Sequence, residues 1–190
     1  MTETTYVALL RGINVGGHDL ISMADLKDIF VALGFREVKT YIGTGNVIFV
    51  GTETSPRQVE ALVEDALAKR FPHPVSVIAH SLAEMEQIIQ HVPSHWLTAT
   101  DQKCNVIFLR HAIDSPDILK NFKPKPDIEE LHYHPGVLFW SAKTSSLTKS
   151  NMLKVNTMPI YKDMTVRVLH TTQKIYEIMQ QTAATEPPRS

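Results

Sequence analysis

Hydrophobic and polar positions in the first half of the chain follow strand and helix patterns in turn. Residues 6–10 form an apolar run of strand length. Ser22 and Asp25 fit a capping box, and apolar side chains then recur at helical spacing until Leu33. The pattern predicts two further strands over residues 38–42 and 47–50, joined by a hairpin turn at residues 43–46. The remaining elements are a helix from residue 56 with a start signal at Ser55, a strand at 75–79 and a helix over 82–92. Ser81 and Glu84 fit a capping box at the start of this last helix.

The second half repeats this order of elements. The predicted strands cover residues 105–109, 131–134, 137–140 and 165–169, and the helical stretches cover 115–122, 145–155 and 171–181. Residue types repeat as well, because Val47-Ile48-Phe49 corresponds to Val137-Leu138-Phe139 at a shift of 90. Leu10-Arg11 corresponds to Leu109-Arg110 at a shift of 99, so the first copy holds nine extra residues after its first strand.

The repeat predicts an α+β fold, built as a duplication of two ferredoxin-like βαββαβ(α) units with antiparallel sheets. We expect the first subdomain at residues 4–92, a linker at 93–102, the second subdomain at 103–181 and a disordered tail at 183–190. We also expect the halves to superpose with Val47 on Val137.

The extra residues of the first copy form a glycine-rich loop that we interpret as a candidate binding site. In a ferredoxin-like sheet ordered 4-1-3-2, the end of the first strand lies beside the turn between strands two and three. The loop should therefore meet that turn, and glycine and asparagine tolerate positive φ and expose backbone N–H groups that can bind an anion. We expect Gly16 or Gly17 to hold a positive φ. The candidate ligand-binding residues are Arg11, Gly12, Asn14, Gly16 and Gly17 in the loop and Thr44, Gly45 and Asn46 in the turn.

A tight hairpin and a long loop require the same residue types. The alternative interpretation is therefore that these glycines and asparagines only form the turn and bind no ligand. The phosphate-loop pattern is approached at Gly12 and Gly17, but His18 and Asp19 stand where its lysine and hydroxyl residue belong. We therefore reject a nucleoside-triphosphatase, and the sequence shows no dinucleotide-binding pattern.

Charge adds a second hypothesis. The 190 residues carry a net charge of −1, but residues 1–100 contain 7 Lys/Arg against 11 Asp/Glu and residues 101–190 contain 12 against 9. A basic stretch over residues 143–174 predicts either a solvated face or contact with RNA or DNA. An enzyme of unknown reaction remains a further alternative.

The other chemistry-bearing residues limit the function classes. The single cysteine, Cys104, excludes an intrachain disulfide and favours a reducing, cytoplasmic location. The N-terminal residues lack a signal-peptide pattern, and no apolar run reaches membrane-spanning length. The nine histidines lack acidic or cysteine partners at ligand spacing, so we expect no metal and no cofactor.

Several motifs resemble a widespread bacterial family known only as domain of unknown function 1697. They are Val7-Ala8-Leu9-Leu10-Arg11-Gly12-Ile13-Asn14-Val15-Gly16-Gly17, Met23-Ala24-Asp25-Leu26, Leu33-Gly34-Phe35, Thr40-Tyr41-Ile42 and Gly45-Asn46-Val47-Ile48-Phe49. The resemblance implies a duplicated ferredoxin-like fold and no established activity. It adds Tyr41 and Arg167 to the candidate ligand-binding residues. Thr165 also matches the family pattern, but Val168 stands where the family usually has asparagine. The loop and the turn, and not the resemblance, lead to our first functional hypothesis: a binding module for an anionic small molecule, phosphorylated or a nucleotide.

Overall fold

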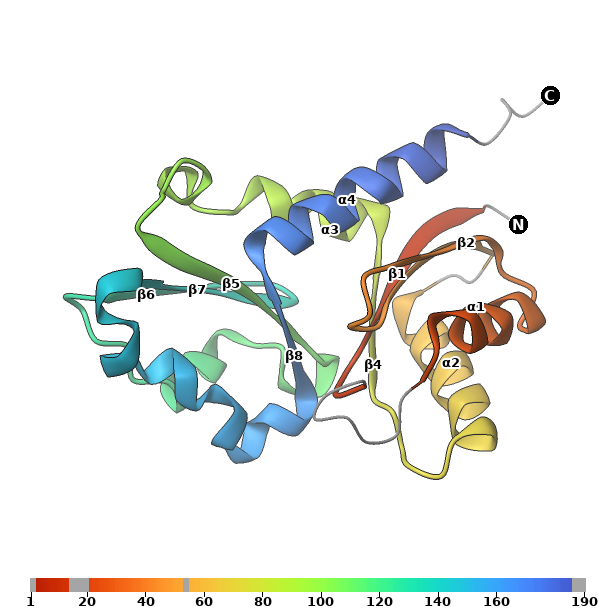
Figure 1. The fold of residues 1–190 in the computed structure, drawn as a ribbon, viewed down its shortest axis with the longest axis horizontal. Helices are drawn as coiled ribbons and strands as arrows, with labels where there is room; N and C mark the ends of the chain where they lie inside the picture. The colour runs from red at the N-terminus through yellow and green to blue at the C-terminus, as the bar shows by residue number, and fades with distance from the viewer. Residues whose placement is uncertain (1–2, 14–20, 53–54, 186–190) are drawn as a thin grey trace. The chain divides into compact units, whose positions relative to one another are not determined.

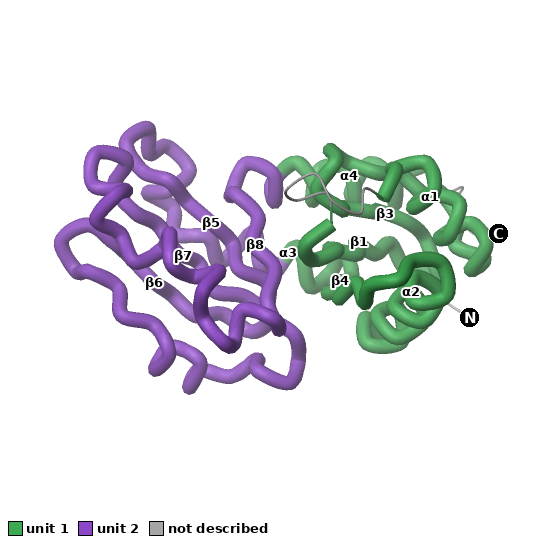
Figure 2. The backbone as a smooth tube through the Cα atoms, turned by 60° about the horizontal axis from the view of Figure 1, so that its bottom comes forward, with its two compact units in different colours: residues 1–86, 174–190 green, residues 87–173 purple. Residues whose placement is uncertain are grey.

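The chain divides into two compact units (Figure 2). Unit 1 comprises residues 1–86 and 174–190, and unit 2 comprises residues 87–173. The structure is a computed structural model that describes residues 3–13, 21–52 and 55–185. The predicted halves, 4–92 and 103–181, follow the sequence repeat, whereas the compact units follow spatial contacts. The chain passes from one unit to the other inside α3 (Leu82–Gln90) and again inside α4 (Leu169–Ala184).

Unit 1 is built on a four-stranded antiparallel sheet, here called sheet A, with the order β2-β3-β1-β4 (Figure 1). This is the 4-1-3-2 order that the element pattern predicts, read from the other edge. In the register, Ala8 lies opposite both Val47 of β3 and Ala79 of β4. The elements of unit 1 before α3 are β1 (Thr4–Leu10), α1 (Met23–Ala32), β2 (Arg36–Tyr41), β3 (Asn46–Gly51), α2 (Pro56–Arg70) and β4 (Val77–Ser81).

Local capping chemistry fixes where the helices of unit 1 begin. Ser22 Oγ accepts from Asp25 N at 2.9 Å, and Ser55 Oγ accepts from Gln58 N at 3.4 Å. At α3 the predicted capping box is present, because Ser81 N donates to Glu84 Oε2 at 2.8 Å and Glu84 N donates to Ser81 Oγ at 3.3 Å. These side chains satisfy amide groups that have no partner within a helix.

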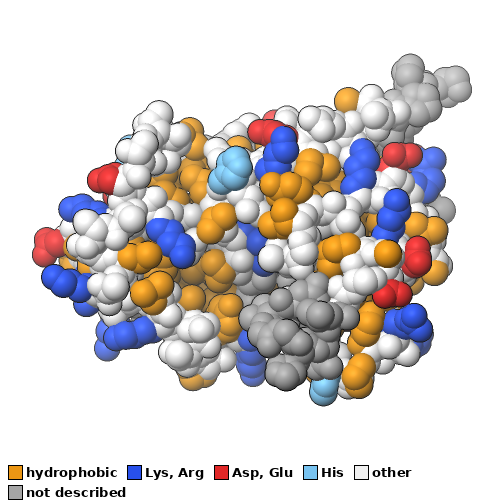
Figure 3. Space-filling model, viewed as in Figure 1, with side chains coloured by type: hydrophobic (Ala, Val, Ile, Leu, Met, Phe, Trp, Pro, Cys, Tyr) orange, Lys and Arg blue, Asp and Glu red, His pale blue; other side chains and the backbone are white. Residues whose placement is uncertain are grey.

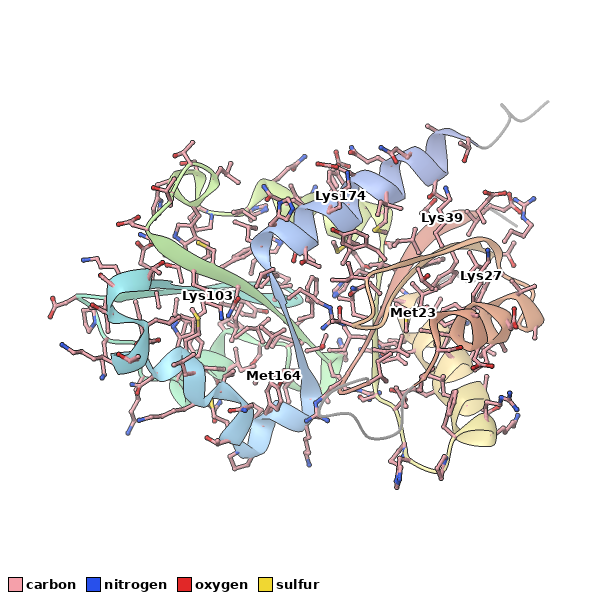
Figure 4. The ribbon with its side chains drawn as sticks, viewed as in Figure 1. Met23, Lys27, Lys39, Lys103, Met164 and Lys174 are labelled. Atoms are coloured by element: carbon pink, nitrogen blue, oxygen red, sulfur yellow. The ribbon has the colours of Figure 1, made fainter. Side chains whose placement is uncertain are left out.

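The core of unit 1 lies between sheet A and the helices α1 and α2. Alternate residues of β1 and β3 face these helices, and Phe49 stacks with Tyr6 and meets Phe30 edge-on at a centroid distance of 5.0 Å. The opposite face of β1 is also buried. On that face, Lys39 Nζ of β2 donates to Thr182 Oγ1 of α4 at 3.1 Å (Figure 4), so the last helical turns belong to the packing of unit 1.

Unit 2 is built on sheet B, which has the equivalent antiparallel order β6-β7-β5-β8. Its strands are β5 (Gln102–Leu109), β6 (Glu129–His134), β7 (Val137–Lys143) and β8 (Met164–Val168). Its remaining elements are short 3-10 helices: η1 (Ser94–Leu97), η2 (His111–Ile113), η3 (Pro116–Asn121), η4 (Thr144–Lys149), η5 (Asn151–Thr157) and η6 (Pro159–Asp163). The fold is therefore mixed α+β with two four-stranded antiparallel sheets.

The two helical stretches predicted at 115–122 and 145–155 are 3-10 turns rather than α-helices, so this part of the prediction is wrong in type. Their backbone bonds join residues three apart, as in Phe122 N to Leu119 O and Ser150 N to Leu147 O. Apolar side chains facing the sheet also recur every three residues, at Met152, Val155, Met158 and Tyr161. A spacing of three suits the 3.0 residues per turn of a 3-10 helix and not the 3.6 of an α-helix.

The expected equivalence of Val47 and Val137 is wrong by one residue. Leu10 N donates to Gly45 O at 2.8 Å, and Leu109 N donates to Gly136 O at 2.9 Å. With Leu10 matched to Leu109, Val47 corresponds to Leu138, which is the residue opposite Ile107 in the register. Residues of β3 and β7 are buried on both faces, so their apolar runs do not reveal which face each residue takes.

The predicted linker and tail also differ in detail from the structure. The linker region contains η1 and the buried Trp96, and β5 already begins at Gln102. The tail was expected from residue 183, but α4 continues to Ala184, and Thr182 within it is fully buried. Residues 186–190 of the predicted tail lie outside the described residues. Among the described residues, no helix is long and apolar enough to cross a membrane.

Candidate ligand-binding site

The start of the glycine-rich loop lies against the turn between β2 and β3, as the sheet order predicts. Besides the hydrogen bond from Leu10 to Gly45, the side chain of Ile13 covers Gly45: a Cβ placed there would lie 2.8 Å from Ile13 Cδ1. Gly45 has a φ of +77°, a conformation that glycine adopts at little cost. The loop and the turn are therefore in such close contact that a residue larger than glycine does not fit at position 45.

Asn46 closes the turn from inside. Its side chain is fully buried, and Nδ2 donates to Tyr41 O at 2.9 Å and to Thr44 Oγ1 at 3.1 Å. The first bond joins the residues on either side of the turn at 42–45, and the second holds the Thr44 side chain within the turn. These contacts give Asn46 a structural role, whether or not a ligand binds nearby.

Ile42 is the unexpected residue of the turn. Its φ is +49°, and its side chain is 46% exposed. A β-branched residue in this left-handed region is an outlier, and such a conformation costs on the order of 1–3 kcal/mol. The exposed side chain gains little from burial in return. Sequence reasoning missed Ile42, because nothing in the residue type signals a positive φ.

Arg11 and Gly12 stand at the surface of the same end of sheet A. The Arg11 side chain is half-buried, and its backbone N–H donates to Ser76 O at 2.8 Å, which ties the loop start to the residue before β4. Gly12 is exposed and has a φ of +71°. The structure therefore brings together Arg11, Gly12, Tyr41, Thr44, Gly45 and Asn46. Asn14, Gly16 and Gly17 lie outside the described residues, and so does the positive φ expected at Gly16 or Gly17.

Tyr41, which precedes the turn, has an electrostatic effect on a lysine of the last helix of unit 1. It ends β2, two residues after Lys39, and it lies close enough to Lys174 of α4 to contribute to that residue's raised pKa. The larger contribution to the pKa of Lys174 comes from its hydrogen bond to Glu177 Oε2, at 2.8 Å. Figure 4 labels Lys39 and Lys174 on their two elements.

Arg167 belongs to unit 2, where it lies on β8. It is only 8% exposed, and Nη1 donates to Thr165 Oγ1 at 2.8 Å and to Val166 O at 2.9 Å. Burial lowers the pKa of Arg167 to about 10, against a smaller opposing effect of Tyr161. The guanidinium is thus held among polar groups of its own strand, and its predicted ligand role stays a prediction.

Histidines gather around one carboxylate in unit 2. Glu130 Oε2 lies 2.9 Å from His95 Nε2 and 3.5 Å from His132 Nε2, and it accepts from Trp96 Nε1 at 3.2 Å. Burial acts to raise the pKa of Glu130, but these hydrogen bonds outweigh it and the pKa falls below its usual value. Within the described residues, no group of three or more His, Cys, Asp or Glu is arranged to hold a metal ion.

Cys104 lacks the setting of a catalytic thiol. Burial, with a smaller effect of the nearby Glu130 charge, raises its pKa to about 11. A reactive thiol needs a lowered pKa, because the thiolate is the nucleophile.

Comparisons with known proteins place the chain in a family without assigning it a function. The chain is similar to a solved structure described as that of "conserved bacterial protein SP0830 from Streptococcus pneumoniae", with 27% sequence identity and a TM-score of 0.83. The alignment covers 94% of this chain and 99% of that one. A comparison with curated proteins found no match. The profile of a family described as "Protein of unknown function (DUF1697)" matches residues 3–139, as the sequence motifs predict. The chain belongs to this family of proteins of unknown function.

Proposed function

We propose that this chain is a binding module for a small anionic ligand, a phosphorylated compound or a nucleotide, at the loop end of sheet A. The observation that carries the proposal is the strained backbone of Ile42, an exposed β-branched residue held at a φ of +49°. Its turn contacts Leu10 and Ile13, which flank Arg11 and Gly12 in the sequence. Backbone strain of this kind clusters at functional sites. Since packing of an exposed side chain does not offset the strain, contact with a ligand is the explanation that we favour.

The chemistry of the neighbouring groups suits an oxyanion. Arg11 supplies a permanent positive charge and a planar set of donors that matches phosphate or carboxylate oxygens. Gly12 lacks a side chain and is exposed, so a ligand can approach the backbone there. Thr44, two residues after Ile42, is also exposed, and its hydroxyl group accepts from Asn46 Nδ2. Asn14, Gly16 and Gly17 follow in the loop and complete the proposed ligand-binding set.

Isothermal titration calorimetry with ATP, ADP, inorganic phosphate and ribose 5-phosphate tests the proposal. At least one probe should bind the wild type, and Arg11→Ala should weaken binding at least tenfold, which is about 1.4 kcal/mol. Arg57→Ala is the matched control, because Arg57 is an exposed arginine of α2 in the same unit. The proposal fails if Arg11→Ala binds as well as the wild type or if no probe binds. The glycines and Asn46 would then serve only to form the loop and the turn.

We also propose that the two sheets are ferredoxin-like units related by duplication, with the halves at 4–92 and 103–181. Four equivalent hydrogen bonds support this: Leu10 and Leu109 each donate to the hairpin glycine, and Arg11 and Arg110 each donate to the residue before the last strand. An experimental structure in which the eight strands do not superpose in this order would contradict it. A cytoplasmic location is proposed from the single cysteine, and cell fractionation tests it.

A further inference from the structure

Five exposed lysines of unit 2 lie on the 3-10 turns and the connecting segment that cover one face of sheet B. Side chains of these turns that face the sheet recur every three residues, from Met152 to Tyr161, and build the core of unit 2. Three of the lysines occupy exposed positions of η4, η5 and η6, and the other two lie in the irregular segment between η3 and β6. We call this surface the lysine face, and it consists of Lys123, Lys125, Lys149, Lys154 and Lys162.

Hydrogen bonds hold two separate segments of the lysine face side by side. Lys125 Nζ donates to the carbonyl oxygen of Lys149, and Asn151 Nδ2 donates to Lys123 O at 2.8 Å. The two segments therefore meet at neighbouring lysines, although they are 24 residues apart in the sequence. The positive charges are brought together by the fold and not by the sequence alone.

A buried carboxylate fixes this arrangement. Glu129 is 4% exposed, and its Oε2 accepts from Lys125 N at 2.6 Å. Its Oε1 accepts from Met152 N at 3.0 Å and from Ser150 Oγ. Glu129 thus bonds to both lysine-bearing segments from inside, while its own charge is enclosed by donors and does not face solvent.

The charge balance of unit 2 leaves the lysine face positive. Unit 2 has ten Lys/Arg and seven Asp/Glu. Of these acids, Glu129 is buried, Glu130 is bonded to His95 and Trp96, and Asp117 pairs with Lys120 at 2.8 Å. The acids beside the lysines in the sequence are Asp127 and Asp163, so five lysines face two carboxylates. Figure 3 shows Lys and Arg side chains spread over the region where the teal and light-blue segments of unit 2 lie in Figure 1.

The residues of the lysine face are not the same as those of the basic stretch at 143–174 that the sequence indicates. Arg167 is buried, and Lys174 lies in unit 1, where it bonds to Glu177. Neither residue belongs to the surface. Lys123 and Lys125, from an earlier part of the chain, take their place.

We propose that the lysine face binds the phosphate backbone of single-stranded nucleic acid without reading its bases. Lysine ammonium groups act as point charges for phosphates, and backbone neutralisation supplies most of sequence-independent affinity. The lysines are distributed over three short turns and an irregular segment, and a flexible single strand can adapt to such a distribution. They carry no group that stacks on a base, so the expected binding is tolerant of sequence.

Fluorescence anisotropy with labelled oligothymidylate and oligouridylate of about 20 nucleotides tests the proposal. If five phosphates are neutralised, the slope of log affinity against log salt is at most about −3.5, and affinity falls roughly a hundredfold between about 50 and 200 mM salt. Lys149→Glu/Lys154→Glu should weaken binding at least tenfold and reduce the slope to about −2 or less. Lys149→Ala/Lys154→Ala should give a smaller loss in the same direction.

Lys27→Glu/Arg57→Glu is the matched control, because it makes the same charge change at exposed positions of α1 and α2 in unit 1. The proposal fails if neither oligonucleotide binds at low salt, or if the control loses as much affinity as the lysine-face variants. It also fails if the protein binds only vesicles of anionic phospholipid. Arg11→Ala should leave oligonucleotide binding unchanged, so this test and that of the small-ligand site can fail separately.

Discussion

Replacing Gly45 by alanine should destabilise the protein by about 2–4 kcal/mol, whereas the same change at Gly43 should be nearly neutral. The two glycines are two residues apart in one turn, but their surroundings differ. Gly45 has a φ of +77°, and an added Cβ would lie 2.8 Å from both Leu10 Cβ and Ile13 Cδ1. An added Cβ at Gly43 would meet no atom of the described residues within 4 Å. Gly12 is intermediate, with a φ of +71° and, among the described residues, no atom within 4 Å of an added Cβ.

The magnitudes follow from three contributions. A left-handed conformation costs a residue with a Cβ about 1–2 kcal/mol. A steric overlap that forces neighbours to move costs about 1–3 kcal/mol more. Ile13 Cδ1 is the end of a flexible side chain, but Leu10 Cβ is fixed by β1. Alanine also reduces the entropy of the unfolded chain, which returns about 0.4–1 kcal/mol. Gly12→Ala should therefore destabilise by about 1 kcal/mol, between the other two variants.

Urea unfolding followed by far-ultraviolet circular dichroism measures these differences. Tryptophan fluorescence alone is unsuitable, because Trp96 and Trp140 both belong to unit 2. If the two units unfold independently, Gly45→Ala should shift the dichroism transition and leave the fluorescence transition in place. Equal destabilisation by Gly43→Ala and Gly45→Ala would refute the reasoning, since the contact with Leu10 and Ile13 would then have no energetic effect.

Three further predictions concern unit 2. Glu129→Gln should lower the unfolding free energy by about 2 kcal/mol, because an amide group would face a backbone N–H. Asp127→Asn, at an exposed position, should change the unfolding free energy little. Urea unfolding followed by tryptophan fluorescence measures both variants. Burial lowers the pKa of His134 below its usual 6.5, and so does the charge of His91, whose ring stacks on that of His134. The unfolded chain therefore takes up this proton first, so stability should fall as the pH drops from 6.5 towards the folded-state pKa, and His134→Gln should reduce that loss in urea titrations at several pH values. Cys104, with a pKa of about 11, should react with a thiol-specific disulfide reagent at pH about 8 roughly a hundredfold more slowly in the folded than in the urea-unfolded protein; equal rates would contradict its burial.

Sequence patterns predicted the features that depend on neighbouring residues. The caps at Ser22, Ser55 and Ser81 form as expected, because each bond joins residues three apart. The strand order and the meeting of the loop start with the hairpin turn followed from the order of the elements. The repeat register failed at Val137, since strands buried on both faces carry no alternation to read.

Sequence patterns did not predict the long-range contacts or the backbone strain. Glu129 accepts a hydrogen bond from Met152 N, 23 residues later, and no local sequence motif predicts that contact. The positive φ of Ile42 contradicts the preference of its own side chain, so its residue type could not indicate it. For the candidate site, the sequence predicted which glycines and polar residues converge, but not that Asn46 is committed to closing the turn.

The division of unit 1 into two separated segments bears on the order of folding during synthesis. Residues 87–173 form one uninterrupted segment and leave the ribosome before residues 174–184, whose Thr182 bonds to Lys39. Unit 2 can therefore complete its core while the face of sheet A that carries Lys39 still lacks its helix. Until α4 arrives, that apolar face is exposed in the nascent chain and is open to chaperones and to aggregation.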